Sequence, residues 1–256
     1  MIISIIIFAA SSCNSKDASP GTAYLAQEKQ LKDLVVQYPD SLILKENLVQ
    51  YYRENNNYSR AIAEVEAALK GYPDNDRFLI IKATLHFEIG DTTNAITTFE
   101  KAISIQPKPE YILSLGSLYA QTSNAAALQL GDALLEAPAG NYRSAALFIK
   151  GLYYSYSGNK QKALPYFDSC VKINYRDMPA YREKAICLYD LKEYSRALDV
   201  LKQAVTVQKS FDEGYYWMGR CYEKLNKKTA AAESYETALQ LDPDYREAID
   251  ALQSIK

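Results

Sequence analysis

The 256-residue sequence predicts an all-α fold built from repeated pairs of helices. Small residues recur with a 34-residue period at Ala61, Ala95, Ala163, Ala197 and Ala231. Core-type residues follow each of them at offsets of 4 and 7, which places them on one face of a helix. The chain is 48% hydrophobic, a composition typical of a folded core. We therefore expect similar helix–turn–helix units stacked around a continuous core.

Each unit also has a first half with helical periodicity. In the last unit, Tyr215, Gly219 and Tyr222 precede Ala231 on one helical face. Polar pairs such as Gly158-Asn159 separate the two halves and are typical of turns. The small residues let two helices approach closely, and aromatic side chains fill the space beside them. Enlarging such a small residue is therefore expected to overpack the contact.

This 34-residue helix–turn–helix pattern resembles the tetratricopeptide repeat. The resemblance covers residues 42–245 and implies a right-handed α-solenoid of about six repeats, at 42–75, 76–108, 109–143, 144–177, 178–211 and 212–245. Residues 23–38 are predicted to form an extra N-terminal helix, and residues 246–256 a polar capping helix that shields the end of the solenoid. The predicted solenoid domain spans residues 23–256.

The third repeat departs from the pattern. Its packing offsets reappear three residues early, at Ala126, Leu130 and Ala133, which we predict to form its packing face. The turn between its helices is short, and the segment APAGNYR adds residues after its second helix. We expect a local change in curvature at this repeat.

The first thirteen residues, MIISIIIFAASSC, differ from the rest of the chain. Residues 2–10 are nearly all apolar, but they are fewer than the roughly 20 residues that span a bilayer. The segment resembles a bacterial lipoprotein signal ending at Cys13, which would carry the lipid. Ala10 stands where the family usually has a larger aliphatic residue, and no basic residue precedes the apolar run. Whether Met1 is the true start therefore stays open.

A short polar segment follows, and it bears on localisation. Residues 14–22, NSKDASPGT, are predicted to be a flexible tether. In lipoproteins that this segment resembles, Asn14 after the lipidated cysteine favours the outer membrane. We expect an outer-membrane lipoprotein of the bacterial envelope that faces the periplasm. Surface exposure, the inner membrane and an unprocessed Cys13 are the alternatives.

Composition argues against several functional classes. The net charge is −2 and no basic stripe stands out, so we expect no nucleic-acid partner. His86 is the only histidine, which rules out histidine clusters for metals and a Ser-His-Asp triad, and we expect it to pack in the second repeat. We therefore predict no enzyme, metal or cofactor. Cys170 and Cys187 fall on helices expected to be neighbours, so a disulfide between them stays open.

The resemblance also implies a binding surface. In tetratricopeptide repeat proteins, the first helix of each repeat lines a concave groove. The Lys/Asn clamp that holds C-terminal carboxylates in some of them is missing here, which disfavours a chaperone co-factor. The matching groove positions, which we predict to contact a partner, are Glu46, Gln50, Arg53, Ile80, Thr84, Phe87, Phe148, Leu152, Tyr156, Arg182, Ile186, Tyr189, Tyr216, Arg220 and Lys224.

These observations predict a non-enzymatic scaffold or adaptor lipoprotein. It would bind a protein or peptide partner in its groove, in the assembly of a cell-envelope complex, while a lipid on Cys13 holds it to the membrane. The identity of the partner and the oligomeric state stay open. The alternatives are a glycan-binding lipoprotein that uses some of the 22 tyrosines, and an unanchored cytosolic adaptor. Exposed coplanar tyrosines would favour glycans, whereas tyrosines buried between helices would favour protein partners.

Overall fold

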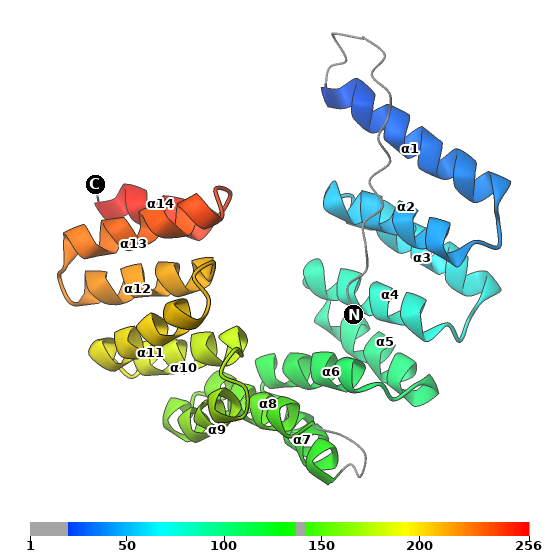
Figure 1. Ribbon diagram of the computed structural model, residues 1–256. Helices are drawn as coiled ribbons and strands as arrows, with labels where there is room; N and C mark the ends of the chain where they lie inside the picture. Colours follow the sequence, from blue (N-terminus) through cyan, green and yellow to red (C-terminus); the bar gives the residue numbers. More distant parts are fainter. Residues whose placement is uncertain (1–19, 137–141, 256) are drawn as a thin grey trace. The chain divides into compact units, whose positions relative to one another are not determined.

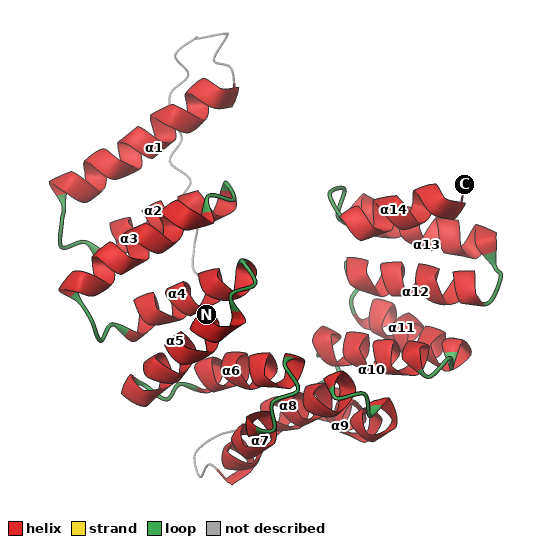
Figure 2. Ribbon diagram, turned by 180° about the vertical axis from the view of Figure 1, so that it is seen from behind, coloured by secondary structure: helices red, strands yellow, loops and turns green. Residues whose placement is uncertain are grey.

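The computed structural model describes residues 20–136 and 142–255, and these residues form fourteen α-helices without a β-strand (Figures 1 and 2). The chain divides after Gly90 into two compact units. The first unit holds helices α1–α4 and the second holds α5–α14. The predicted all-α solenoid of helix pairs is confirmed.

The first unit is built around a core shared by its four helices, α1 (Pro20–Gln37), α2 (Leu42–Glu54), α3 (Tyr58–Gly71) and α4 (Asp76–Glu88). Buried residues such as Tyr52, Val65 and Phe78 form this core, and Leu31 and Val35 of α1 pack against it. Helix α1 begins three residues before the predicted start, so residues 20–22 of the predicted tether are helical. Cys13 and the rest of the N-terminal segment lie outside the described residues.

The second unit contains ten helices, and each packs against the next along the chain. The first helices of neighbouring repeats also contact each other, since α6 packs on α8 and α10 packs on α12. The helices are α5 (Thr92–Ile105), α6 (Pro109–Gln121), α7 (Ala126–Glu136), α8 (Arg143–Tyr156), α9 (Lys160–Ile173), α10 (Met178–Asp190), α11 (Tyr194–Val207), α12 (Asp212–Lys224), α13 (Lys228–Leu241) and α14 (Arg246–Ile255).

Local sequence sets where the helices begin and how the turns close. The side chains of Ser41, Asn75 and Asp177 each accept a hydrogen bond from a backbone N–H three residues later, which satisfies a free donor of the first helical turn. The turns inside the repeats need a left-handed residue, and Asn56 and Gly158 supply it with φ values of 56° and 86°. Capping residues therefore mark where these helices begin, and left-handed residues close the turns within the repeats.

Close helix contacts explain the small residues of the repeat. A Cβ atom added to Gly151 would lie 2.7 Å from Cε1 of Phe167 on the next helix. A Cβ atom on Gly219 would overlap the ring of Tyr235 in the same way, two repeats further along the chain. The predicted pairing of a small residue with an aromatic one is thus confirmed at both positions.

The packing face predicted for the third repeat was wrong by one residue. The buried residues of α7 are Ala127, Gly131 and Leu134, whereas Ala133 of the predicted set is exposed. A Cβ atom on Gly131 would lie 2.9 Å from Cγ of Lys150, so this glycine must face α8. One residue corresponds to a rotation of about 100° around the helix axis. The close approach at the glycine therefore sets the face of α7.

Three cysteines are structural. Cys170, Cys187 and Cys221 are free and buried, so the disulfide left open between the first two does not form. The thiol of Cys170 donates to the carbonyl oxygen of Ser144 at 3.4 Å, and that of Cys187 to the hydroxyl of Ser155 at 3.4 Å. Burial raises the pKa of Cys170 and Cys221 to about 12, which keeps both protonated at neutral pH.

Candidate binding surface

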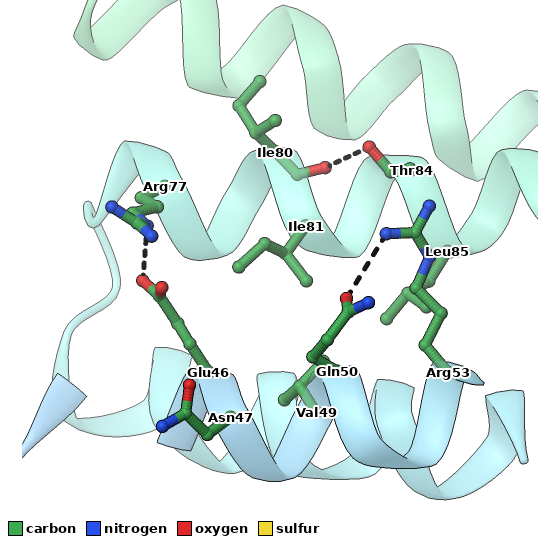
Figure 3. Close-up of a pocket in the computed structure, with 10 residues that line it drawn as sticks. All are labelled: Glu46, Asn47, Val49, Gln50, Arg53, Arg77, Ile80, Ile81, Thr84 and Leu85. Carbon is green, nitrogen blue, oxygen red and sulfur yellow. Dashed lines mark hydrogen bonds and ion pairs between the residues drawn. The ribbon is translucent and has the colours of Figure 1, made fainter. Parts of the chain in front are cut away.

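In the first unit, the facing sides of α2 and α4 enclose a hollow of about 350 Å³, which we call the α2–α4 hollow (Figure 3). Val49 and Leu85 are buried at its floor, and Ile80 and Ile81 are half-buried beside them. Its lining residues are Glu46, Asn47, Val49, Gln50, Arg53, Arg77, Ile80, Ile81, Thr84 and Leu85. The hollow combines an apolar floor with a polar and charged rim, a composition common to binding sites.

Two ion pairs join α2 to α4 at the rim. Nε of Arg77 lies 2.6 Å from a carboxylate oxygen of Glu46 (Figure 3). Nε of Arg53 donates to both carboxylate oxygens of Glu88, at 3.0 and 2.9 Å. The side chain of Arg77 is 71% exposed, while that of its partner Glu46 is 15% exposed. The accessible charge at this end of the hollow is therefore the arginine.

The hollow brings together most groove residues predicted for this unit. Glu46, Gln50, Arg53, Ile80 and Thr84 all line it, whereas the predicted Phe87 is 43% exposed and lies outside its lining. The prediction missed the other five lining residues, which are Asn47, Val49, Arg77, Ile81 and Leu85. Arg77 holds the second position of its predicted repeat, which is itself a groove position of the family, so the register could have identified it.

In the second unit, side chains at the equivalent groove positions contact other residues of the chain. Nη1 of Arg182 donates to both carboxylate oxygens of Glu213, at 2.7 and 2.8 Å, and Nε donates to Glu183 at 3.2 Å. Glu183 is 6% exposed, and its burial raises the pKa of its carboxyl. Arg182 therefore ties α10 to α12 and compensates a buried acid.

An aromatic cluster occupies the C-terminal end of this unit, formed by Tyr189, Tyr216, Trp217, Arg220, Tyr235 and Tyr245. The ring of Tyr216 lies 5.6 Å from that of Trp217 and 5.1 Å from that of Tyr245. The guanidinium of Arg220 lies over the rings of Tyr189 and Trp217, at 5.6 and 5.8 Å, and donates to the hydroxyl of Tyr216 at 2.8 Å. Ring contacts and cation–π contacts hold this cluster together.

Several groove residues predicted in the second unit serve packing instead. Leu152 is 4% exposed and Tyr216 is 7% exposed, because neighbouring side chains cover both. Phe148 is half-buried and packs edge-on against Phe167. Of the remaining predicted residues, Tyr156 and Lys224 are exposed, while Ile186, Tyr189, Arg182 and Arg220 are half-buried.

A second hollow, of about 410 Å³, lies at the edge of the aromatic cluster between α12 and α14. Its lining carries three carboxylates, from Glu223, Glu247 and Asp250, beside Arg220 and Tyr216. Glu223 accepts a hydrogen bond from the hydroxyl of Tyr235 and so belongs to the packing of α12 on α13. The α2–α4 hollow therefore presents an arginine at its rim, whereas three carboxylates line the second hollow.

Comparison with known sequences identifies the architecture. The signature of the tetratricopeptide repeat matches residues 47–110 and 148–214, which is more than half of the chain, and a second signature of the same repeat matches residues 212–245. The chain belongs to the tetratricopeptide repeat family. The matched segments cover helices in both units, and the third predicted repeat lies between them.

The chain is also similar to individual known proteins. The chain is 24% identical to stress-induced-phosphoprotein 1 of Caenorhabditis elegans, over 84% of this chain and 67% of that protein. It is 26% identical to a DnaJ homolog subfamily C member 7 homolog of Dictyostelium discoideum, but it spans only 43% of that protein. A tetratricopeptide repeat protein from Parabacteroides merdae has the same fold, with a TM-score of 0.73, 22% identity and coverage of 92% of this chain and 93% of that one.

Within residues 20–136 and 142–255, no group of three or more His, Cys, Asp and Glu side chains is arranged to hold a metal ion. His86 is half-buried on α4, and its charge interaction with Glu66 helps to lower the pKa of that carboxyl, after the larger effect of Lys82. None of the helices in the same two segments combines the length and apolar content needed to cross a bilayer.

Proposed function

We propose that this tetratricopeptide repeat protein is a non-enzymatic scaffold that binds protein partners in the α2–α4 hollow. Membership of the family supports a protein-binding scaffold, and the hollow supplies a specific place on it. Five of the six residues that the repeat register predicted for this unit line one concave surface, and this observation carries the proposal. In the second unit, the predicted residue Leu152 is buried, and the ring of Tyr216, which lines the hollow between α12 and α14, is 7% exposed because it packs in the aromatic cluster.

The chemistry of the hollow suits a peptide or protein surface. Fully burying one leucine-sized side chain contributes about 1.5–3 kcal/mol. The amides of Asn47 and Gln50 stand beside the apolar floor and can donate to or accept from a partner backbone. Arginine at the edge of such a pocket is a common energetic anchor of protein interfaces. Together these groups provide an apolar anchor point and polar groups that orient the partner.

The tyrosines support protein binding over the glycan alternative. Tyr52, Tyr181 and Tyr235 are among the most deeply buried side chains of the described chain. Tyr154 stacks on Tyr166 with ring centroids 5.4 Å apart, and the ammonium of Lys162 lies over the same ring at 4.1 Å. These rings contact one another and the core, so they do not form a coplanar platform for a sugar.

Site-specific photo-cross-linking tests this proposal. A photoreactive residue at Gln50, on the rim of the hollow, should capture a discrete partner in cells. The same residue at Ala63, exposed on α3 of the same unit, serves as the matched control and should not. Equal capture from both positions, or capture from Ala63 alone, would remove the hollow as the binding surface.

We further propose that the protein is an envelope lipoprotein and acts in the assembly of an envelope complex. The support is the segment MIISIIIFAASSC followed by the polar residues 14–19. The test compares the full-length chain with Cys13→Ala by cell fractionation and by mass spectrometry of the N-terminal peptide. Diacylglyceryl-modified Cys13 in the membrane fraction is the expected result. An unmodified, soluble full-length chain would support the cytosolic alternative.

A further inference from the structure

The charged groups of the α2–α4 hollow are unequally exposed, and this inequality bears on the kind of partner. Each rim arginine is paired with a carboxylate, so the rim is close to neutral. The carboxylates of Glu46 and Glu88 are 15% and 23% exposed, while Arg77 and Arg53 are 71% and 38% exposed. An approaching partner therefore meets guanidinium groups first, with the acids beneath them.

Arg77 has capacity for a second acid. A guanidinium carries five N–H donors in a planar fork, and Glu46 is the only ionic partner of Arg77 within the described chain. Arg53 has less capacity, since it already binds both oxygens of Glu88 and contacts Gln50 at 3.4 Å. The free side of Arg77 can therefore accept a carboxylate in a charge-assisted hydrogen bond. A lysine of a partner would instead meet a like charge.

The apolar floor lies at a fixed distance from this donor. Ile80 and Ile81 follow Arg77 by three and four residues, so they lie one helical turn further along α4, which is about 5 Å (Figure 3). The lining continues along α2 to Arg53 and along α4 to Leu85. A partner chain that crosses the hollow therefore extends on both sides of the apolar anchor.

We infer that the occupant of the α2–α4 hollow is an internal partner segment that carries an acidic side chain and a large aliphatic or aromatic side chain about 5 Å apart along its axis. The carboxylate binds Arg77 and the apolar side chain packs on Ile80 and Ile81. This inference rests on the proposed binding function and adds the chemistry of the partner. We assign the acid to a side chain because the lining continues past Ile80 and Ile81 to Leu85 and Arg53, which gives a segment room to run through the hollow.

A peptide array tests the spacing and the charge. Short peptides in a Ser/Ala background carry one Glu and one Leu at every separation up to two helical turns, and attachment through the C-terminus removes the free terminal carboxylate. The labelled full-length chain should bind best where Glu and Leu lie about 5 Å apart, which is about two residues in an extended peptide and three or four in a helical one. Replacing Glu by Gln, or Leu by Ala, should weaken binding about tenfold, the effect of one charge-assisted hydrogen bond or one buried side chain.

Variants of the chain assign these preferences to residues. Arg77→Gln should abolish the preference for Glu over Gln and retain the preference for Leu, while Ile80→Ala should weaken the preference for Leu. Arg77→Lys should retain part of the preference for Glu, because it keeps the charge but loses the planar fork. Arg246→Gln removes an exposed arginine of α14 and is the matched control, which should behave as the parent chain.

Three outcomes would overturn the inference: a preference for Lys over Glu, a Glu preference that survives Arg77→Gln, or an array that retains no peptide. Each can be separated from failure of the proposed function, because cross-linking at Gln50 reports partner binding without reference to the chemistry of the partner. Loss of an exposed ion pair costs only about 0–1 kcal/mol, so Arg77→Gln should stay folded.

Discussion

The two units use equivalent repeat positions for opposite purposes. In the first unit the ninth position of two successive repeats holds Gln50 and Thr84, which leave space between the helices and line a hollow. In the second unit the same position holds Leu152, which is buried, Ile186, which is half-buried, and Arg220, whose guanidinium lies over the rings of Tyr189 and Trp217. The repeat register thus determines which face a residue occupies. The size of the side chain and its neighbours determine whether that face stays open to a partner.

The charged residues show the same contrast. Arg77 in the first unit has one ionic partner within the described residues and stays 71% exposed. Arg182 in the second unit binds Glu213 and Glu183, and its side chain is 30% exposed. An arginine at a groove position is therefore a candidate for binding only where the chain does not already satisfy its donors.

The largest expected effect is at the aromatic cluster. Tyr216→Ala should lower the free energy of unfolding by about 3–5 kcal/mol, since it removes a buried ring that contacts three others. Thr84→Ala in the α2–α4 hollow should change it by less than about 0.5 kcal/mol. Urea unfolding followed by circular dichroism measures both. Similar losses for the two variants would contradict the division into a packed face and an open one.

A smaller effect is expected from filling space between helices. Gly219→Ala should cost about 1–3 kcal/mol, because the new methyl group would overlap the ring of Tyr235. At Gly71, which ends α3, an added Cβ would have no atom within 4 Å, so Gly71→Ala should be neutral or stabilise by up to about 1 kcal/mol. Shifts in the urea midpoint report the difference. A neutral Gly219→Ala variant would show that α13 can move away from α12.

The smallest effect concerns two buried carboxylates whose pKa values shift in opposite directions. Glu28 in α1 accepts hydrogen bonds from Lys32 and from the hydroxyl of Tyr52, and these lower its pKa below the ordinary value of 4.5. Its ionised form therefore stabilises the fold above pH 4.5, and this contribution is lost as the pH falls through the lowered pKa. Burial raises the pKa of Glu183, so its protonated form stabilises the fold below pH 4.5. This contribution is lost as the pH rises through the raised pKa.

Replacement of each carboxylate by its amide separates the two cases. At pH 7, Glu28→Gln should destabilise the chain, while Glu183→Gln should be neutral or stabilising, because the amide resembles the protonated acid that burial favours. Both differences from the parent chain should shrink when urea unfolding is repeated below pH 4.5. A destabilised Glu183→Gln variant at pH 7 would show that its ion pair with Arg182 outweighs the cost of burial.

The sequence predicted the repeats well and the site only in part. Periodicity identifies helices and faces because small and aromatic residues must meet at fixed offsets, as Gly151 and Phe167 do. It failed at α7, where a single glycine, Gly131, sets the rotation of the helix. Periodicity also could not distinguish the exposed residue Gln50 from the buried residue Tyr216, since both hold groove positions of the repeat. Whether such a residue is open depends on neighbours from other helices, which a single repeat does not encode.

The measurement that tests the central claim most directly is a cysteine footprint of the partner complex. Thr84 and Ile186 hold the ninth position of repeats in different units, and both are half-buried. Each is replaced by cysteine in a separate variant. In a Cys13→Ala background, the remaining cysteines are buried thiols that react slowly. The partner captured through Gln50 should protect Thr84→Cys from alkylation and leave Ile186→Cys unchanged. Protection of Ile186→Cys alone would place the binding surface in the second unit and contradict the assignment to the α2–α4 hollow.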